Sequence, residues 1–432
     1  MKSFLLLPLY TATVIAHVSS HSHDEISGFT SLLQLSIREP ECPANFLDIT
    51  SCNNSTQCNA QRSQIWSFSS PCIKSIQSEE EICVFTDSNF AQGRGISLIT
   101  TVARAKFIAS QPAFTNLDGI KLLPQTTPPS YMMTEIPGKG MGLEAIHDIK
   151  QGELIMADTP SLMVDSRSFK WLPAKERRLL QTAAVEHLPE AHQAAIMQLT
   201  AHVNTRGMPK DEIVGKITLV NSFDVIPDLL DPVRDEFFTL FPNISRFNHD
   251  CRPNAAYRFN HETMTHNVRA LRDIESGEEL TLTYTNPSLS RKDRQDRLKL
   301  WGFECTCDLC MQDKWHTTES DRRIAQINSL MPKFTQIPSP ATPEMAETLI
   351  DLHKDEELWE AIWLPYTYAA LQYSTNGDAS MAEKYAQMAI RHGIPIVGDT
   401  HDYMIEMATL VESPLEHWSW RINVKEPFVV WT

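Results

Sequence analysis

The chain has 432 residues, of which 42% are hydrophobic, and it carries a formal net charge of −16. This length predicts two or three domains with enough apolar side chains for packed cores. The acidic balance excludes a general nucleic-acid binder, which would carry a basic footprint. It suits a basic partner such as a lysine-rich protein segment, although acidity also serves ordinary solubility.

Residues 1–20 have the pattern of a secretory signal. Lys2 gives a positive start, an apolar stretch follows, and Val18-Ser19-Ser20 offers small residues for cleavage. The stretch is too short to cross a bilayer comfortably, so no membrane span is expected in the mature chain. The alternative is an apolar N-terminal strand or helix in a protein that is not exported.

Residues 21–125 are predicted to form a small, loop-rich module to which the sequence assigns no role. Segments 83–87 and 90–99 predict a strand, a glycine turn and a second strand. A proline-rich stretch at 123–130 marks the predicted domain boundary. Five cysteines of the module can form two disulfides with one cysteine left over: Cys42, Cys52, Cys58, Cys72 and Cys83.

Residues 131–286 are predicted to form a second domain of short sheets. Three alternating glycines at 138–142 precede an apolar strand, and glycine lets another molecule lie against the backbone. Segments 146–155 and 271–280 share the pattern x-Asp-Ile-x-x-Gly-Glu, which predicts two similar strand–turn–strand units. Residues 165–220 predict a helical insert with helices over 175–186 and 190–204, followed by a polar kink at Asn221.

Residues 313–432 are predicted to be helical. The spacing of Ala370, Tyr373, Ala382 and Ala389 is typical of one tetratricopeptide helix pair, with its turn at 377–378. Gly393 is expected to end the second helix. An unrelated helical pair is the alternative.

Four cysteines of the second half predict a metal site. Cys305-x-Cys307-x-x-Cys310 places three thiolates on one short loop within 287–312, and Cys251 supplies a fourth from a distant segment. Four thiolates form a closed tetrahedral zinc site that would staple the two segments together. Disulfides or unpaired buried cysteines are the alternative, and His249 is a rival ligand that four cysteines make unnecessary.

Asn248 and His249 directly precede that cysteine, so whatever they bind is held beside the metal site. An asparagine amide offers both donor and acceptor groups, which suits adenine or the polar groups of an amino acid. Tyr284 ends the apolar strand 280–283. A tyrosine there is usually a core residue, but its position between the Asn-His pair and the cysteine loop favours a catalytic role.

At these residues the chain resembles the SET-domain protein-lysine methyltransferases over roughly 131–310. Asp250 stands where that family has serine. The segment 219–223 and the C-terminal helices resemble the SMYD branch, without its MYND zinc finger. The motifs that carry the resemblance are Gly138-Lys139-Gly140-Met141-Gly142, Asn248-His249-Asp250-Cys251-x-Pro253-Asn254, Gly277-Glu278-Glu279-Leu280-Thr281-x-x-Tyr284 and Phe303-x-Cys305-x-Cys307-x-x-Cys310.

The resemblance implies an α+β fold: a SET β-fold of several short sheets with a pseudoknot, the helical insert, a post-SET zinc loop and the C-terminal helical region. It implies S-adenosyl-L-methionine as methyl donor, Zn²⁺ in the cysteine site, a lysine-containing protein (histone or non-histone) as substrate, and no direct contact with nucleic acid. Tyr284 would be catalytic, and the zinc ligands would be Cys251, Cys305, Cys307 and Cys310. The residues that contact the donor would be Lys139, Gly140, Met141, Asn221, Asn248, His249, Tyr284 and Phe303.

Methyl transfer needs the lysine as a neutral amine, whereas its free pKa is about 10.4. A narrow apolar channel favours the neutral form by desolvation, and Tyr284 would align it. The competing function is a catalytically silent SET fold that serves as a zinc-stabilised interaction protein. The signal-like start predicts the secretory pathway or the cell exterior, whereas the resemblance favours the nucleus or cytoplasm.

Overall fold

The computed structural model describes residues 65–115, 129–226, 235–336 and 339–424. The predicted signal at 1–20 and the cysteines Cys42, Cys52 and Cys58 lie outside these residues. The strands of the described residues are β1 (Phe68–Lys74), β2 (Glu81–Asp87), β3 (Ile96–Thr101), β4 (Tyr131–Ile136), β5 (Gly140–Ala145), β6 (Leu154–Asp158), β7 (Leu162–Asp165), β8 (Ser222–Val225), β9 (Phe237–Leu240), β10 (Asn248–His249), β11 (Ala255–Asn260), β12 (Thr265–Ala270) and β13 (Glu279–Leu282).

The helices lie around and after these strands. They are α1 (Phe90–Gly93), α2 (Val102–Ala109), α3 (Pro112–Thr115), α5 (Ser168–Trp171), α6 (Ala174–Glu186), α7 (Glu190–Met197), α8 (Lys210–Asn221), α9 (Arg291–Leu298), α10 (Asp308–Met311), α11 (Lys314–Leu330), α12 (Pro343–Asp355), α13 (Trp363–Thr375), α14 (Ala379–Val397) and α15 (Asp402–Glu412), with short 3₁₀ turns η1 (Ile244–Arg246), η2 (Lys299–Trp301) and η3 (Met331–Phe334).

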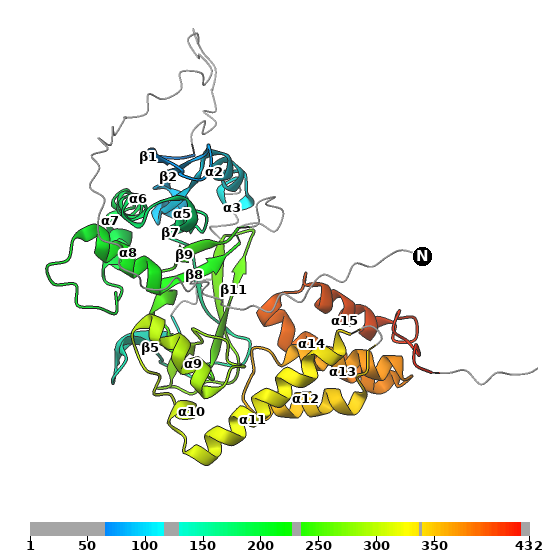
Figure 1. The fold of residues 1–432 in the computed structure, drawn as a ribbon. Helices are drawn as coiled ribbons and strands as arrows, with labels where there is room; N and C mark the ends of the chain where they lie inside the picture. Colours follow the sequence, from blue (N-terminus) through cyan, green and yellow to red (C-terminus); the bar gives the residue numbers. More distant parts are fainter. Residues whose placement is uncertain (1–64, 116–128, 227–234, 337–338, 425–432) are drawn as a thin grey trace, which may run out of the picture.

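Three sheets organise the strands of the described residues (Figure 1). A six-stranded sheet has the order β1-β2-β3-β7-β9-β8, a four-stranded sheet β10-β13-β5-β4, and a three-stranded sheet β11-β12-β6. Short sheets, inserted helices and a helical C-terminal region confirm the predicted α+β class. Parallel pairing of β10 with β13 brings the segment of Asn248 beside the strand that leads to Tyr284.

The six-stranded sheet is covered by helices on both faces. Successive residues of a strand point to opposite faces, and β2 shows the consequence. Ile82 and Val84 pack in one core with Leu180 of α6, whereas Cys83 and Phe85 belong to a second core that contains Ile108 of α2. The alternation in β2 therefore joins the N-terminal strands to both cores.

The sequence suggested a separate N-terminal module, but in the structure the N-terminal strands belong to the same sheet as strands of the second domain. β3 pairs in parallel with β7, which lies beyond the proline-rich stretch, through Ser97↔Leu162 to Ile99↔Val164. Because β3 is buried along its whole length, it needs a neighbour on each side to satisfy its backbone groups. The six-stranded sheet thus crosses the predicted boundary at 123–130.

One disulfide, Cys72–Cys83, joins β1 to β2 at positions that face each other in the ladder. Its sequence separation of 11 residues corresponds to a stabilisation of about 2–3 kcal/mol from restricting the unfolded chain. We expect the Cys72→Ser/Cys83→Ser variant to lose that amount in free energy of unfolding, measured by urea denaturation without reductant. An unchanged midpoint would show that the bond is not formed in the protein.

The two segments with the shared x-Asp-Ile-x-x-Gly-Glu pattern pair with each other. Ile149 and Ile274 exchange both backbone hydrogen bonds, each 2.9 Å long. Asp148 accepts from the amide of Ser276 at 3.1 Å, and Asp273 accepts from the amide of Gln151 at 2.9 Å. The sequence repeat therefore reflects two matching turns that cap each other.

The helices inside the helical insert differ from the prediction, although α5 to α8 together span Ser168 to Asn221. α6 matches the expected helix at 175–186, but α7 ends at Met197, and α8 was not predicted. His202 adopts a left-handed φ of 52°, which is incompatible with a helix continuing to 204. Asn221 is the last residue of α8, with β8 following directly, and is not in a separate kink.

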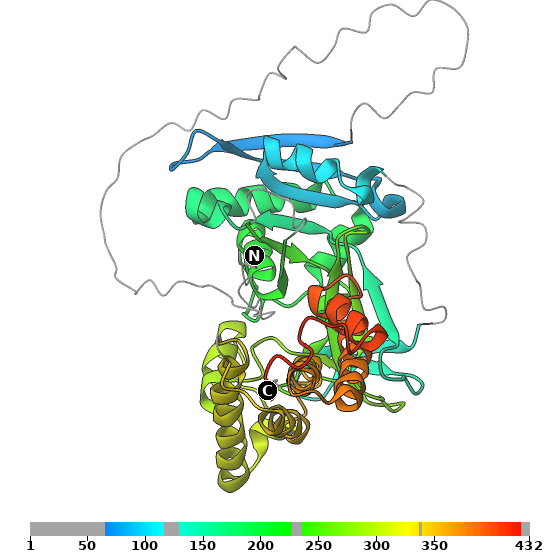
Figure 2. The ribbon, with the colours of Figure 1, turned by 90° about the vertical axis from the view of Figure 1, so that its right-hand side faces the viewer.

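The helices α11 to α15 form a lobe below the six-stranded sheet in Figure 2. α13 and α14 share a core that includes Ala370, Ala382 and Ala389, and the turn between them has Gly377 at φ 85°. The prediction that Gly393 ends the second helix is wrong. α14 continues to Val397, and Gly393 instead gives room to Met404 of α15, whose sulfur would lie 2.4 Å from an added Cβ. The tetratricopeptide assignment stays a prediction.

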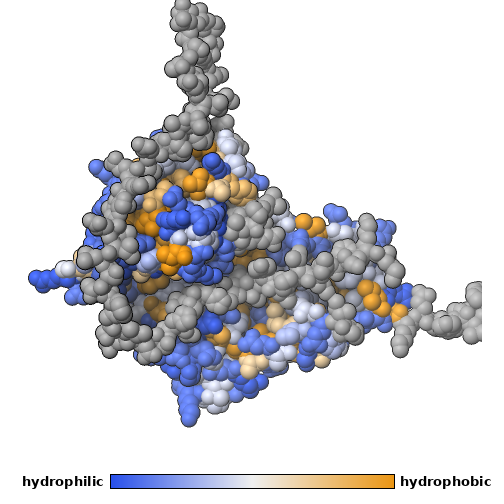
Figure 3. Space-filling model, turned by 45° about the horizontal axis from the view of Figure 1, so that its top comes forward, coloured by the Kyte–Doolittle hydropathy of each residue, from blue (hydrophilic) through white to orange (hydrophobic). Residues whose placement is uncertain are grey.

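The net charge of −16 leads one to expect many hydrophilic side chains at the surface. On the face shown in Figure 3, apolar side chains gather in small groups with hydrophilic side chains between them. Within the described ranges, every helix falls short of the length and apolarity that a membrane crossing requires.

Candidate functional site

The glycine run at 138–142 forms the turn of the β4–β5 hairpin. Gly138 and Gly140 have φ of 76° and 79°, which glycine adopts without strain. Lys139, at the tip between them, reaches back so that its Nζ lies 2.6 Å from Glu279 Oε2. Met141, which was predicted to contact the donor, is 44% exposed. The hairpin thus presents an open backbone beside β13, with the charge of Lys139 paired to Glu279.

Asn248 shares the carboxylate of Glu279 with Lys139. Its Nδ2 donates to Glu279 Oε1 at 2.9 Å. Gly142 makes this possible, because a Cβ at that position would lie 2.6 Å from Asn248 Nδ2. Lys139, Gly142, Asn248 and Glu279 therefore form one polar cluster from three segments that are far apart in the sequence.

Asn254 lies buried behind this cluster, where the sequence suggested only a turn. Its Nδ2 donates to the Glu279 carbonyl at 2.8 Å, and its Oδ1 accepts from the Thr281 amide at 2.9 Å. The side-chain amide thereby makes the two hydrogen bonds with β13 that the backbone of a neighbouring strand would make. Asn254 positions the backbone of Glu279.

The His249 side chain is buried, and both of its ring nitrogens contact other groups of the protein. It is 5% exposed, its Nδ1 accepts from the Tyr284 amide at 3.0 Å, and its Nε2 lies 3.4 Å from Cys251 Sγ. Because Nδ1 accepts, the proton sits on Nε2 and points at the sulfur. Burial lowers the pKa of His249 to about 3, so the ring stays neutral. This ring links Tyr284 to the cysteine cluster, which leaves only its backbone for a bound molecule.

Tyr284 lies in a largely aromatic pocket of about 430 Å³ that opens to solvent. Its hydroxyl donates to the Phe247 carbonyl at 2.7 Å, and burial raises its pKa. With the proton directed at Phe247, the lone pairs of the phenol oxygen remain as acceptors. The residues that line the pocket are Val220, Asn221, Ser222, Phe223, Ser245, Phe247, Tyr257, Thr283, Tyr284 and Trp301.

Asn221 forms part of the same wall and is 9% exposed. Its Nδ2 donates to the carbonyls of Ile217 and Thr200, both at 2.8 Å. The second bond ties the pocket to the loop after α7. The helical insert therefore supplies one side of the pocket, and Asn221 anchors it.

The ring of Phe303 lies near the rings of His249, His202 and Tyr284. Its ring centroid lies 6.2 Å from that of His249 and 6.2 Å from that of His202, and 6.3 Å from that of Tyr284. His202 belongs to the loop after α7 and packs against Gly302, where an added Cβ would lie 3.3 Å from His202 Cβ. We did not single out His202 from the sequence, because a lone histidine in a polar loop carries no signal there.

The four cysteines of the second half converge in one buried cluster. Their sulfurs all lie within 4.8 Å of one another, with Cys251 Sγ 3.6 Å from Cys310 and 4.0 Å from Cys305. Tetrahedral zinc with Zn–S bonds of about 2.3 Å requires S···S separations of about 3.8 Å. None of the four forms a disulfide. The cluster fits the predicted zinc site.

Helix α9 supports this cluster with polar side chains. Gln295 clasps the backbone of Cys305, donating to its carbonyl at 2.8 Å and accepting from its amide at 2.9 Å. Arg291 Nε donates to the Cys310 carbonyl at 2.8 Å. Burial by itself lowers the pKa of Arg294, but the negative charge of Cys251 and Cys310 raises it overall. Arg294 therefore places a buried cation beside the sulfurs of the cluster.

The SET domain family matches residues 140–285. The chain contains a SET domain. This match begins at Gly140 in the glycine hairpin, includes the Asn248–Cys251 segment and Tyr284, and ends before α9 and the cysteine loop.

Among the curated relatives, two histone-lysine N-methyltransferases match parts of this chain. The histone-lysine N-methyltransferase set5 of Schizosaccharomyces pombe is 31% identical over 204 residues, which cover 47% of this chain and 55% of that protein. The histone-lysine N-methyltransferase SMYD3 of Homo sapiens is 43% identical over 77 residues, 17% of this chain and 18% of that protein. The chain thus spans about half the length of set5 and less of SMYD3.

Among solved structures, the SET domain of LSMT bound to lysine and AdoHcy aligns with 12% identity and a TM-score of 0.29, over 71% of this chain and 93% of that one. The SET domain assignment rests on the family match to residues 140–285.

Supporting residues that we missed in the sequence are Glu279, Asn254, Arg294 and Gln295. Their roles depend on partners that only the folded chain brings near.

Proposed function

We propose that the chain is an S-adenosyl-L-methionine-dependent protein-lysine N-methyltransferase. The observation that carries this proposal is the aromatic pocket around Tyr284, which opens beside Asn221 and adjoins the Asn248–His249 segment of the SET motif. The names of the relatives, both histone-lysine N-methyltransferases, support it. The substrate we propose is a lysine of a basic protein such as a histone, which the net charge of −16 would attract.

The donor would bind between the β4–β5 hairpin and the rings of Phe303 and His202. Lys139 and Asn248 offer polar groups, and Gly140 and Met141 offer open backbone. S-adenosyl-L-methionine supplies an electrophilic methyl group on sulfur. The chain supplies orientation, which for two aligned reactants removes a large part of the barrier.

Within the pocket, Phe223, Tyr257 and Trp301 would surround the lysine side chain and exclude water. Desolvation favours the neutral amine, which is the nucleophile. The Tyr284 oxygen, whose proton is engaged with Phe247, would accept a hydrogen bond from that amine and direct its lone pair. The raised pKa of Tyr284 keeps the phenol neutral, so no general base is assigned to it.

We infer that Cys251, Cys305, Cys307 and Cys310 hold one structural Zn²⁺. Four protein ligands leave no open position, so the metal would act as a clamp and not in the chemistry. The clamp would hold the loop that carries Phe303 next to His249.

A histone substrate favours the nucleus or cytoplasm as the place of action.

The full chain incubated with methyl-labelled S-adenosyl-L-methionine and purified histones tests the function. We expect label on lysine, located by mass spectrometry, and donor binding by calorimetry. Donor binding without transfer to histones or other basic proteins would favour the silent interaction protein. Absence of donor binding by the folded chain would refute the proposal.

Gly142→Ala is expected to weaken donor binding about tenfold. The added Cβ would lie 2.6 Å from Asn248 Nδ2 and 2.6 Å from Ile136 Cγ1, so Asn248 must move. Overpacking of this kind costs about 1–3 kcal/mol, and about 1.4 kcal/mol corresponds to tenfold in affinity. Calorimetric titration of the donor measures it.

Gly215→Ala is the matched control for this variant. Its Cβ would lie 2.8 Å from Arg178 Cδ, where α8 packs against α6, so the crowding is similar but away from the polar cluster. We expect donor affinity to be unchanged in the control. Equal donor affinities in Gly142→Ala and the control would remove Asn248 from the donor site.

A further inference from the structure

The carboxylate of Glu356 lies buried between the C-terminal helices and the SET domain. Its side chain is 1% exposed. Oε2 accepts from Arg252 Nη2 at 2.5 Å and from Ser320 Oγ at 2.8 Å, and Oε1 accepts from Arg323 Nε at 2.6 Å. Glu356 follows α12, and Ser320 and Arg323 lie on α11. Two helices of the C-terminal region thus hold one carboxylate that faces Arg252.

Arg252 connects Glu356 to the backbone of Cys251, one of the four clustered cysteines. Its Nη1 donates to the carbonyls of Cys251 at 2.8 Å and Pro287 at 3.0 Å, and its amide donates to Asp250 Oδ1 at 2.8 Å. Its side chain is 8% exposed. A buried guanidinium needs a counter-ion, and Glu356 is the carboxylate that pairs with it among the described residues. The orientation of Arg252, and with it the Cys251 carbonyl, depends on Glu356.

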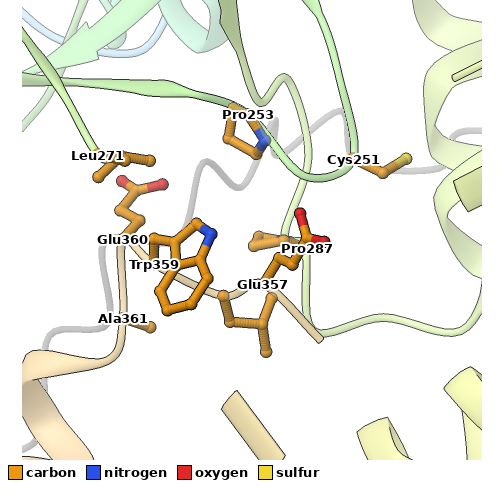
Figure 4. Close-up of a pocket in the computed structure, with 9 residues that line it drawn as sticks. Cys251, Pro253, Leu271, Pro287, Glu357, Trp359, Glu360 and Ala361 are labelled. Atoms are coloured by element: carbon orange, nitrogen blue, oxygen red, sulfur yellow. The ribbon is translucent and has the colours of Figure 1, made fainter. Parts of the chain in front are cut away.

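The cavity in Figure 4 lies along the same contact. A small hollow is walled by Cys251, Pro253 and Pro287 on one side and by Trp359 and Glu360 on the other. Figure 4 shows the Cys251 sulfur pointing away from this hollow. The C-terminal region therefore meets the backbone side of Cys251, while the sulfur faces the other three cysteines.

We propose that Glu356 is a positioning residue for the metal site: through Arg252 it holds the Cys251 arm, so the C-terminal helical region contributes to metal retention. The inference rests on the zinc clamp proposed above. Cys305, Cys307 and Cys310 share one short loop, which α9 supports. Cys251 lies 54 residues before Cys305, so its place in the tetrahedron needs an anchor of its own, and Glu356 with Arg252 provides it.

Zinc release from the full chain tests this proposal. Zinc per chain is measured by elemental analysis, and the release rate by a coloured chelator in excess, well below the unfolding temperature. We expect Glu356→Gln and Arg252→Gln to release zinc about tenfold to a hundredfold faster, the range for groups that orient metal ligands. Arg323→Gln, whose side chain is 26% exposed, should keep the fold and accelerate release less.

The double variant Arg252→Gln/Glu356→Gln separates positioning from general destabilisation. If Glu356 acts through Arg252, the double variant releases zinc no faster than Arg252→Gln alone, because coupled sites are not additive. Arg178→Gln is the matched control. Arg178 is 29% exposed and paired with Asp211 on the helical insert, and its loss should leave the release rate unchanged.

Three outcomes would overturn the inference. Additive effects in the double variant would make Glu356 a stabilising residue only, and wild-type release rates in both single variants would exclude any role in retention. A wild-type chain without zinc would refute the clamp itself. Because zinc content and release are measured without turnover, these results stay distinct from a failure of methyl transfer.

Discussion

Replacing Tyr284 with phenylalanine is expected to lower methyl transfer by about a hundredfold or more, since small losses of alignment cost about that much. The phenol oxygen is the group that would align the lysine amine, and its proton is already engaged with the Phe247 carbonyl at 2.7 Å. Donor binding should survive, because the donor would contact the backbone at this position. Initial rates with histones, alongside calorimetric donor titration, separate the two effects.

Tyr366→Phe is the control for this variant. Tyr366 is 3% exposed and lies in the core of the C-terminal helices, so the same oxygen is lost away from the pocket. We expect wild-type rates from the control. Normal turnover by Tyr284→Phe would remove Tyr284 from catalysis, and equal loss of donor affinity would assign it to binding instead.

Replacing Cys251 with serine is expected to lower zinc content from about one ion per chain and to destabilise the loop that carries Phe303. A structural zinc contributes on the order of 10 kcal/mol to the unit that forms around it, so losing one of its four ligands should cost several kcal/mol. His249 would also lose the sulfur that lies 3.4 Å from its Nε2. Donor affinity and methyl transfer should therefore fall together.

The double variant Cys72→Ser/Cys83→Ser is the control for thiol loss elsewhere. Those two cysteines join β1 to β2 in the six-stranded sheet, away from the cluster, so zinc content should not change. Elemental analysis of both variants and the wild type gives the answer. Unchanged zinc in Cys251→Ser would remove Cys251 from the ligand set.

Motif order was readable from the sequence because each motif is local. Three cysteines within 305–310 place three sulfurs on one loop wherever that loop lies, and the glycines at 138–142 require a turn. The helix at 175–186 followed from its periodicity and begins one residue earlier, at Ala174. Gly393 misled because glycine ends many helices, whereas here it is buried against Met404 inside α14.

By itself the sequence determined the SET resemblance, the α+β class, the cysteine cluster and the candidate residues around Tyr284. Only the tertiary structure decided that β1 to β3 complete the six-stranded sheet, that Glu279 joins Lys139 to Asn248, and that Glu356 reaches the backbone of Cys251 through Arg252. The physical reason is the separation along the sequence between residues that interact. A ligand spacing or a turn depends on neighbouring residues, whereas a buried carboxylate finds its partners across 104 residues only when folding removes both from water.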